Sequence, residues 1–362
     1  MVQIKDATSH IDIVSLSKSF GEKQIISDIS FTIQRGSFTV LLGPSGCGKT
    51  TILRMIAGLE ESNGGKILLN KEDIIHKTPS QRSISMVFQS YALFPHLSVR
   101  ENIIFGLKIR KVKKHLREEK LIKAAKLVGL QDVLDKKPGQ LSGGQKQRVA
   151  LARAFVADHS LCLMDEPLSN LDAKLRHEMR IEIKELQKRL DITVLYVTHD
   201  QTEAMSMADH VILLNNGKIE QQGTPQELYQ KVATTFVGKF IGTPPMNILK
   251  LHKTKEVISI NDKAIKINSL NSLSDGEFFL GIRPEDMKIS KDQKGIKGVV
   301  LFQDYHGSDT ILGLQLDKNS HEKPFLIRIR GQNRYNIGEM INMAWDEKKI
   351  NIFDSSGKRK EI

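Results

Sequence analysis

The sequence has few cysteines, few aromatic residues and no long apolar segment. Only two cysteines, Cys47 and Cys162, occur among 362 residues, so no disulfide framework is indicated and a reducing cytoplasm is expected. No apolar run approaches the roughly 18 residues that a membrane-spanning helix needs. The N-terminal residues also lack the apolar core of a secretory signal, and we expect neither a signal peptide nor a membrane span.

Positive charge is the main surplus. The chain carries 54 Lys and Arg against 42 Asp and Glu, a formal net charge of +12. The lysines are spread along the chain, and no basic block is interleaved with aromatic residues, so we expect no nucleic-acid partner. The charge is compatible with binding nucleotide phosphates or an anionic membrane face.

Glycine is concentrated in the stretch GPSGCGKT, which follows an apolar run and precedes a helical pattern. This spacing matches the phosphate-binding loop G-x-x-x-x-G-K-[ST], a glycine loop between a strand and a helix. Lys49 would reach the β- and γ-phosphates, and the Thr50 hydroxyl would bind Mg²⁺. Cys47 is interpreted as a small side chain and not as a nucleophile, because no base is visible beside it. The candidate nucleotide-binding residues here are Gly43, Pro44, Ser45, Gly46, Cys47, Gly48, Lys49, Thr50 and Thr51.

A second glycine turn opens the helical pattern from Lys146 to Ala157. Its serine is a good helix cap, and its glycines leave the first amides of the helix accessible to an anion. The candidate residues of this second anion cradle are Ser142, Gly143, Gly144 and Gln145.

Polar residues lie at or just past the ends of apolar strands at Gln89, Asp165, Glu166 and His199. The carboxyl ends of parallel strands meet at one edge of a sheet, where α/β proteins bind ligands. Gln89 and Asp165 are expected to hold Mg²⁺, Glu166 to polarise the attacking water and His199 to sense the γ-phosphate. Phe20, before the turn at Gly21, either stacks on a purine or is a core aromatic, and its position alone leaves both interpretations open.

The pattern of elements changes near Gly242–Pro245. Before about residue 235, apolar strands alternate with helices, including a polar helical stretch over 101–137, which predicts an α/β sheet. Beyond the boundary, short alternating segments predict a small all-β, barrel-like module. These segments are 257–260, 278–282, 299–302, 325–329, 340–345 and 350–353.

Together these motifs resemble those of the ATP-binding subunits of ABC transporters. GPSGCGKT resembles the Walker A loop, Gln89 falls at the Q-loop, LSGGQ is similar to the signature, and LCLMDEP to Walker B with a catalytic Glu166. Ser169–Asp172 resembles the D-loop and His199 the switch histidine, while Phe20 stands where the family has its adenine-stacking aromatic. Two tail segments, IGTPPMN and GIRPED, are similar to the importer subgroup that serves oligosaccharides and sn-glycerol 3-phosphate.

The resemblance implies an α/β P-loop NTPase (ABC ATPase) core at 1–240, with an inserted helical subdomain at about 90–157, and a C-terminal all-β OB-like regulatory domain at 241–362. It implies ATP and Mg²⁺ as cofactors and a homodimer in which each ATP lies between the Walker A loop of one chain and the LSGGQ of the other. The expected partners are two membrane-spanning permease subunits and an extracytoplasmic solute-binding protein, at the cytoplasmic face of the cell membrane.

The expected function is ATP hydrolysis that energises import of a solute. The expected solute is sn-glycerol 3-phosphate, with maltose or another oligosaccharide as the alternative. A DNA-repair-type ABC ATPase is a more distant alternative, since it needs a long coiled coil and the gap from Thr50 to Leu141 holds no sustained heptads. A ribosome-acting ABC protein would normally carry two ATPase cassettes, and an exporter is also conceivable.

Overall fold

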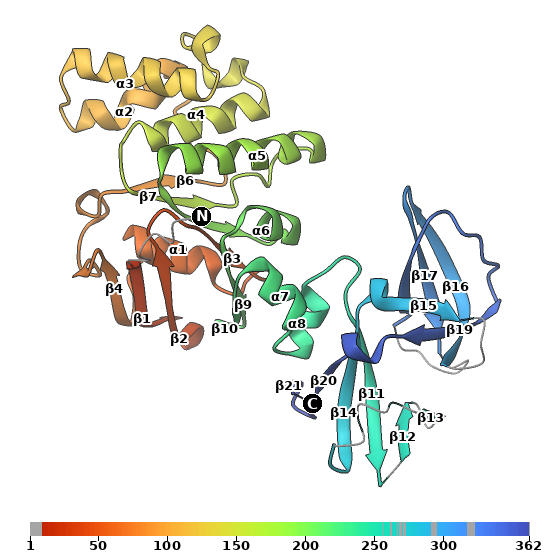
Figure 1. Cartoon of the computed structure of the whole chain (residues 1–362). Helices are drawn as coiled ribbons and strands as arrows, with labels where there is room; N and C mark the ends of the chain where they lie inside the picture. Colours follow the sequence, from red (N-terminus) through yellow and green to blue (C-terminus); the bar gives the residue numbers. More distant parts are fainter. Residues whose placement is uncertain are drawn as a thin grey trace, which may run out of the picture. The chain divides into compact units, whose positions relative to one another are not determined.

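The computed structural model describes residues 9–255, 257–260, 263–265, 267, 270, 273–290, 295–316 and 323–361 (Figure 1). The chain forms two compact units, Met1–Pro225 and Gln226–Ile362. Among the residues described, no helix combines the length and the apolar composition of a membrane span.

The first unit is built on a sheet with the strand order β10-β9-β3-β8-β7-β6. All its pairs are parallel except the hairpin of β9 and β10. Every residue of β3, β7 and β8 is buried, as continuous apolar strands covered on both faces should be. The strands are β3 (Phe38–Leu42), β6 (Ile84–Val87), β7 (Leu161–Asp165), β8 (Thr193–Thr198), β9 (His210–Asn215) and β10 (Lys218–Gly223).

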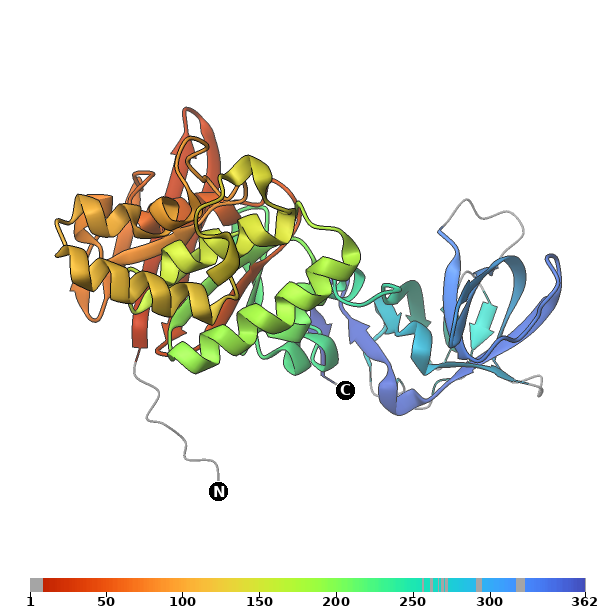
Figure 2. The same cartoon turned by 90° about the horizontal axis from the view of Figure 1, so that it is seen from above.

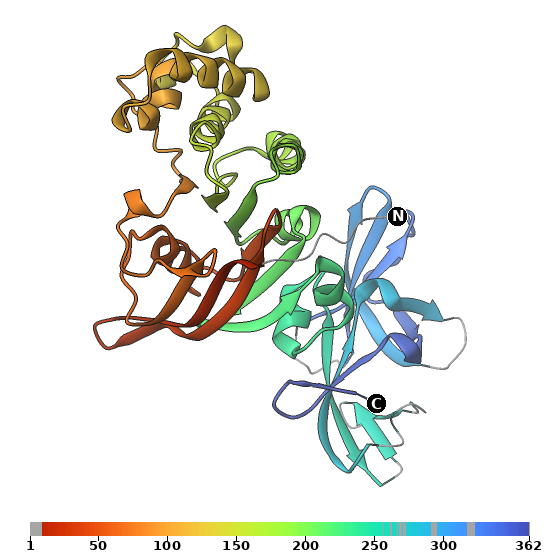
Figure 3. The same cartoon turned by 60° about the vertical axis from the view of Figure 1, so that its left-hand side comes forward.

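A second, antiparallel sheet has the order β2-β1-β4-β5, and its hairpin of β1 and β2 appears as the long red ribbon in Figure 3. The strands are β1 (Ser9–Phe20), β2 (Lys23–Gln34), β4 (Gly64–Leu69) and β5 (Glu72–Asp73). The sequence predicts only short β segments here, at 11–16 and 29–33, and both hairpin strands run well beyond them, with 12 residues each. The dipeptide Asn216–Gly217 predicts a type I′ turn between β9 and β10, and their positive φ angles, 47° and 72°, confirm it.

The helices of the first unit are α1 (Lys49–Ala57), α2 (Val99–Ile109), α3 (Lys114–Leu127), α4 (Gly143–Phe155), α5 (Ala173–Leu190) and α6 (Gln201–Met207), with 3₁₀ turns at Pro79–Gln81, Gln131–Val133 and Pro138–Gln140. α2, α3 and α4 share an apolar core that includes Ile103, Leu121 and Val149. α5 runs beside α4 (Figure 2), and an ion pair of 2.9 Å joins Arg148 to Glu182 across them.

The helical stretch expected over 101–137 is interrupted. α2 ends at Ile109, and Lys111 adopts a φ of 56°, which a continuous helix cannot contain. α3 then ends at Leu127, just before Gly129 with a φ of 63°. The polar composition of this stretch obscures both breaks, because lysine and glutamate favour helix in any register.

Arg82 connects the end of α1 to the segment that leads into β6. Its buried guanidinium donates to the carbonyl oxygens of Met55, Ile56, Ile75 and Lys77 at 2.7 to 2.9 Å. The last carbonyls of a helix have no partner within it, so this one side chain satisfies the end of α1 and holds the next segment against it.

The second unit has two antiparallel sheets, with the orders β13-β12-β11-β14-β20-β21 and β15-β19-β16-β17-β18, that share one apolar core including Leu280 and Leu312. The all-β prediction is confirmed, although β11 was missed. The elements are α7 (Pro225–Gln230), α8 (Thr235–Phe240), β11 (Asn247–Thr254), β12 (Val257–Ile260), β13 (Lys263–Ile265), β14 (Gly276–Ile282), β15 (Met287–Ser290), β16 (Ile296–His306), β17 (Asp309–Gln315), β18 (Phe325–Arg330), β19 (Met340–Trp345), β20 (Asn351–Phe353) and β21 (Arg359–Lys360), with 3₁₀ turns at Pro284–Asp286 and Glu347–Lys349.

His10 joins the two sheets of the first unit. Its ring is fully buried, with Nδ1 2.5 Å from Thr193 Oγ1 and Nε2 3.1 Å from Ser160 Oγ. Burial, together with the charge of Arg35, lowers the pKa of His10 from 6.5 to about 4. The folded chain therefore keeps His10 neutral over a pH range in which the unfolded chain takes up a proton.

This difference predicts that stability falls as the pH drops from about 6.5 toward about 4. His10→Gln cannot titrate, so its free energy of unfolding should lose less between pH 6.5 and 5, by about 2 kcal/mol relative to the wild type. Urea unfolding of the first unit at several pH values measures the difference. His115→Gln, at an exposed position of α3, is the control; equal pH slopes in the His10 variant and the wild type would contradict the prediction.

Candidate active site

The glycine loop connects β3 to α1, and two of its glycines adopt backbone angles that other residues rarely do. Gly46 has a φ of 81° and Gly48 a φ of 102°. A Cβ added to Gly46 would meet no atom within 4 Å, so the loop borders open space there. A Cβ on Gly48 would lie 2.2 Å from Cδ1 of Ile26 in β2. The loop therefore needs glycine for its curvature and for its close approach to the hairpin.

The first turn of α1 presents amides without a side-chain cap. Gly48 occupies the cap position and Lys49, Thr50 and Thr51 begin the helix, so the N-terminus is suited to an anion. The buried Lys49 ammonium donates to the carbonyl oxygens of Gly43 and Pro44, both at 2.8 Å.

Cys47, within this loop, has a buried side chain, and burial raises the pKa of its thiol. A buried thiol with a raised pKa is a poor nucleophile. The geometry thus agrees with its interpretation as a small structural side chain.

Thr50 and Asp165 lie 115 residues apart in the sequence and come together in the fold. The Thr50 hydroxyl donates to Asp165 Oδ1 at 2.9 Å. Asp165 is 7% exposed; burial raises the pKa of its carboxyl group, and the Thr50 hydrogen bond opposes that rise. A hydroxyl oxygen beside a carboxylate is the hard, oxygen-only donor set that Mg²⁺ prefers, so these residues fit the expected ion.

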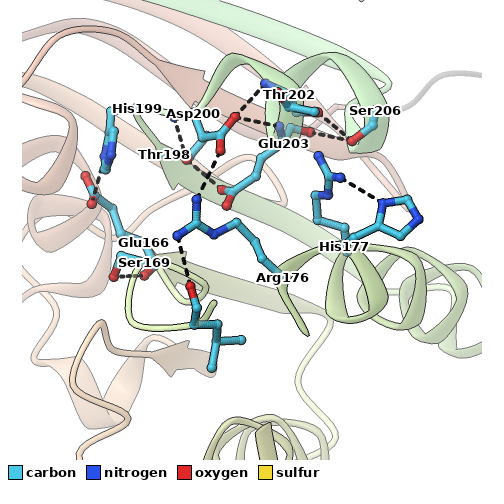
Figure 4. Close-up of polar contacts among 12 residues, drawn as sticks. Glu166, Ser169, Arg176, His177, Thr198, His199, Asp200, Thr202, Glu203 and Ser206 are labelled. Carbon is cyan, nitrogen blue, oxygen red and sulfur yellow. Dashed lines mark hydrogen bonds and ion pairs between the residues drawn. The ribbon is translucent and has the colours of Figure 1, made fainter. Parts of the chain in front are cut away.

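Glu166 and His199 form the next pair along the same sheet edge (Figure 4). His199 Nδ1 lies 3.0 Å from Glu166 Oε2, and both side chains reach solvent, with 20% of Glu166 and 55% of His199 exposed. Glu166 has a φ of 43°, which is strained for a residue with a side chain. Its N–H donates to the Val197 carbonyl at 3.0 Å, which holds the strained residue at the end of β8.

Gln89 follows β6 and is exposed. Its backbone carbonyl accepts a hydrogen bond of 3.0 Å from Asn170 Nδ2. Just beyond it, Tyr91 and Ala92 have φ angles of 63° and 44°. Both of their carbonyls accept hydrogen bonds of 2.6 Å from the guanidinium of Arg153 in α4. One arginine therefore holds the strained turn after Gln89.

The LSGGQ segment starts α4 with a reciprocal cap. The Ser142 hydroxyl accepts from the Gln145 N–H at 3.3 Å, and Gln145 Oε1 accepts from the Ser142 N–H at 3.0 Å. A Cβ on Gly144 would lie 3.1 Å from the Leu175 side chain. Ser142 and Gly143 are exposed. Between residues 43–51 and 142–145, all of which the structure describes, there is no hydrogen bond or ion pair.

Phe20 is the last residue of β1 and is 50% exposed, so it is not a core aromatic. The Lys18 ammonium lies 4.7 Å from the centre of its ring. Lys18 pairs across the hairpin with Ile26, the residue that touches Gly48, so Phe20 lies only two residues farther along the strand from the glycine loop.

Comparisons with known proteins agree with this geometry. Residues 26–169 match the ABC transporter family, and residues 280–353 match the TOBE domain. The chain belongs to the ABC transporter family. It is an ATP-binding and ATP-hydrolysing transporter subunit, and the predicted fold class, an ABC ATPase core followed by an all-β OB-like domain, is confirmed.

The relatives of this ABC protein span nearly its whole length. An sn-glycerol-3-phosphate import ATP-binding protein of Brucella abortus is 44% identical over 97% of this chain and 99% of its own. A trehalose/maltose import ATP-binding protein of Thermococcus litoralis is 42% identical over 96% and 98%. The solved structure of CbiO1 from Clostridium perfringens, part of the ABC transporter complex CbiONQ, has a TM-score of 0.57 and 29% identity, covering 61% of this chain and 90% of its own.

The structure brings together some of the predicted site residues and leaves others apart. The glycine loop, Asp165, Glu166 and His199 share one sheet edge, where Leu42 pairs with Thr198 and Asp165 with Val197. The Gln89 backbone is joined to this edge through Asn170, which follows Glu166 in the chain. The LSGGQ residues make no polar contact with the glycine loop.

Sequence reasoning missed three charged residues that support these loops: Arg153, Arg176 and Glu203. Arg153 falls within the helical pattern from Lys146 to Ala157, and no sequence motif includes Arg176 or Glu203, which is 3% exposed. The partners of Arg153 lie 61 and 62 residues away in the chain, so no local spacing indicates its role. Arg176 and Glu203 have partners nearer in the sequence, but these pairings follow no recognised motif spacing.

Arg153→Ala should loosen the turn after Gln89. Without the guanidinium, two strained residues lose the donors to their carbonyls, and local opening becomes easier. We expect amide hydrogen exchange over 89–97 to accelerate at least about tenfold. Arg153→Lys should show a smaller effect. Arg148→Ala in the same helix breaks the pair with Glu182 and should leave this segment unchanged; equal acceleration in both alanine variants would contradict the assignment.

Proposed function

We propose that this ABC ATPase energises import of sn-glycerol 3-phosphate across the cytoplasmic membrane. The observation that carries the proposal is the full-length similarity to import ATP-binding proteins whose names specify that solute. Trehalose or maltose is the second candidate, because the import protein of Thermococcus litoralis is nearly as similar. A sulfoquinovosyl glycerol transport ATP-binding protein of Agrobacterium fabrum, 40% identical, extends this range of solutes.

We assign the nucleotide phosphates to the glycine loop and the start of α1. Lys49 exchanges its two carbonyl partners for phosphate oxygens, and Gly46 borders the space that those oxygens take. Thr50, Asp165 and Gln89 are the proposed Mg²⁺ ligands, and Phe20 stacks on the adenine. The ion, when bound, screens the charge of the phosphates.

Glu166 is the proposed general base, and His199 its partner at the γ-phosphate. The Glu166 carboxylate accepts a proton from the attacking water, and His199, 3.0 Å away, holds the carboxylate in place. The two adjacent carboxylates have different partners, because Asp165 accepts from the Thr50 hydroxyl and Glu166 contacts His199. These neighbouring acids thus have different proposed roles: Asp165 binds Mg²⁺, and Glu166 accepts the proton of the attacking water.

The second cradle acts on the nucleotide of another copy. Ser142 and Gly143 are exposed at the start of a capped helix, and within their own chain they make no polar contact with the glycine loop. A two-fold homodimer lets the two cradles of each chain complete the two nucleotide sites of the pair. Bound ATP then favours the closed dimer, and hydrolysis removes that preference.

The remaining assignments concern partners and domains. Two permease subunits and an extracytoplasmic binding protein complete the importer, and the chain is peripheral at the cytoplasmic face of the membrane. Residues 1–240 form the ATPase domain, with a helical insertion at about 90–157, and residues 241–362 form the regulatory domain. The two family matches, 26–169 and 280–353, fall inside these ranges.

Glu166→Gln should keep ATP binding and lose turnover. The amide cannot accept the proton of water but has the same size, so the ATPase rate should drop at least about 100-fold. In size-exclusion chromatography with ATP and Mg²⁺ the variant should elute as a dimer, because without hydrolysis the closed dimer does not reopen.

Glu178→Gln, an exposed change in α5, is the matched control and should behave as the wild type. Wild-type-like turnover in Glu166→Gln would reject its role as the base. A Glu166→Gln variant that stays monomeric with saturating ATP and Mg²⁺ would reject the shared site.

Deletion of the gene tests the solute directly. Uptake of labelled sn-glycerol 3-phosphate should be lost, restored by the wild type and not restored by Glu166→Gln. Unchanged sn-glycerol 3-phosphate uptake with lost maltose or trehalose uptake would move the assignment to the second candidate.

A further inference from the structure

Two segments that follow strands β7 and β8 enclose a small cavity beside the candidate catalytic pair (Figure 4). The cavity measures ~40 Å³, room for a water molecule or two, and Glu166 and His199 form part of its lining. On the β7 side, the Ser169 hydroxyl donates to the Glu166 carbonyl at 2.9 Å. On the β8 side, His199 contacts the Glu166 carboxylate. The two walls of the cavity are therefore the segment that contains Glu166 and the segment that contains His199.

Arg176, in the second turn of α5, spans this cavity. Its Nη2 donates to the Leu171 carbonyl at 3.0 Å, in the segment that follows Glu166. Its Nη1 lies 3.5 Å from Asp200 Oδ2, in the segment that follows β8. Its Nε is buried without a hydrogen-bond partner. Arg176 is thus the charged link from one wall to the other.

Asp200 is held in place on its other side. Its Oδ1 accepts from the Thr202 and Glu203 amides and caps α6, which leaves Oδ2 for Arg176. The Asp200 N–H donates to the Thr198 hydroxyl at 3.0 Å. His199 lies between two residues fixed in this way, so its backbone position depends on what holds Asp200.

Glu203 forms the floor beneath these contacts. It is 3% exposed and accepts from the Tyr196 and Thr198 hydroxyls at 2.9 and 2.6 Å. The carboxylates of Asp200 and Glu203 therefore both face the guanidinium across the cavity. A cation at position 176 compensates this pair of acids, and a neutral residue would leave them uncompensated.

We infer that Arg176 is a positioning residue for ATP hydrolysis, which couples the segment after Glu166 to the segment that carries His199. The contacts close a ring that runs from Glu166 through Ser169 and Leu171 to Arg176, and back through Asp200 and His199. Without Arg176, the segments remain joined near Glu166, through its contacts with Val197 and His199, and can shift more easily relative to each other. A displacement of about 1 Å in a reacting group costs on the order of 100-fold in rate. The inference rests on the proposed role of Glu166 and His199.

The test is steady-state ATPase kinetics of the full-length protein. Arg176→Ala should lower kcat by about 10- to 100-fold and change KM for Mg-ATP by less than about threefold, since it touches no nucleotide-binding residue. Arg176→Lys should recover part of kcat. Arg180→Ala, one turn farther along α5 where the side chain contacts His177, should match the wild type. An unchanged kcat in Arg176→Ala, or an equal loss in Arg180→Ala, overturns the inference.

Asp200→Asn is a second variant that keeps the cap of α6 and removes the charge that faces Arg176. If Arg176 acts through Asp200, the double variant should lose no more than the worse single variant. If the fold-losses in kcat of the two single variants multiply in the double variant, the coupling is overturned. Where Arg176→Ala folds poorly, kcat of Asp200→Asn alone still tests the link, and an unchanged kcat there overturns it. An inactive wild type, or an active Glu166→Gln, would instead reject the proposed function.

Discussion

The parallel pairing of β3, β8 and β7 sets the positions of the glycine loop, Asp165, Glu166 and His199 at the candidate active site. Leu42 lies opposite Thr198, and Asp165 lies opposite Val197, so the three strands end within about one residue of each other. Neighbouring strands are about 4.8 Å apart. The glycine loop, Asp165 and His199 therefore start within roughly 10 Å of each other. The hydrogen bond from Thr50 to Asp165 passes across the end of β8, which lies between their strands.

Backbone strain is concentrated at the loops that leave this edge. Glu166 has a positive φ and precedes a proline, and Tyr91 and Ala92 form a consecutive pair with positive φ. Each such residue costs about 1 to 2 kcal/mol relative to a relaxed backbone. These conformations persist because a backbone hydrogen bond holds Glu166 and the guanidinium of Arg153 holds Tyr91 and Ala92. At this edge the two adjacent carboxylates have different partners, Thr50 for Asp165 and His199 for Glu166.

The local features of this site could be predicted from the sequence, because their signals are local. The glycine spacing of the loop, the Ser142 cap and the Asn216–Gly217 turn each depend on a few consecutive residues. The order of buried strands also predicted which polar residues would meet at the sheet edge.

What the sequence left unpredicted depends on distant pairings or on weak local signals. The partners of Arg176 and Arg153 belong to other loops, so nothing near these arginines distinguishes them from surface residues. The break between α2 and α3 depends on one residue, Lys111, in a left-handed conformation without glycine. β11 alternates buried and exposed residues, but its exposed positions are Lys250, His252 and Thr254, and such a polar strand resembles a loop in composition.

Three side chains link the loops at the sheet edge. They come from α4, which begins at LSGGQ, and from the segment and helix that follow Glu166. Arg153 extends from α4, the helix that LSGGQ begins, to the turn after Gln89. Asn170 and Arg176 come from the segment after Glu166 and the helix behind it, and they reach the Gln89 carbonyl and Asp200. A second chain bound at the start of α4 would therefore act on a helix whose other end already holds the Gln89 turn. Because a packed helix moves as a rigid element, such contact could reposition this turn without local unfolding.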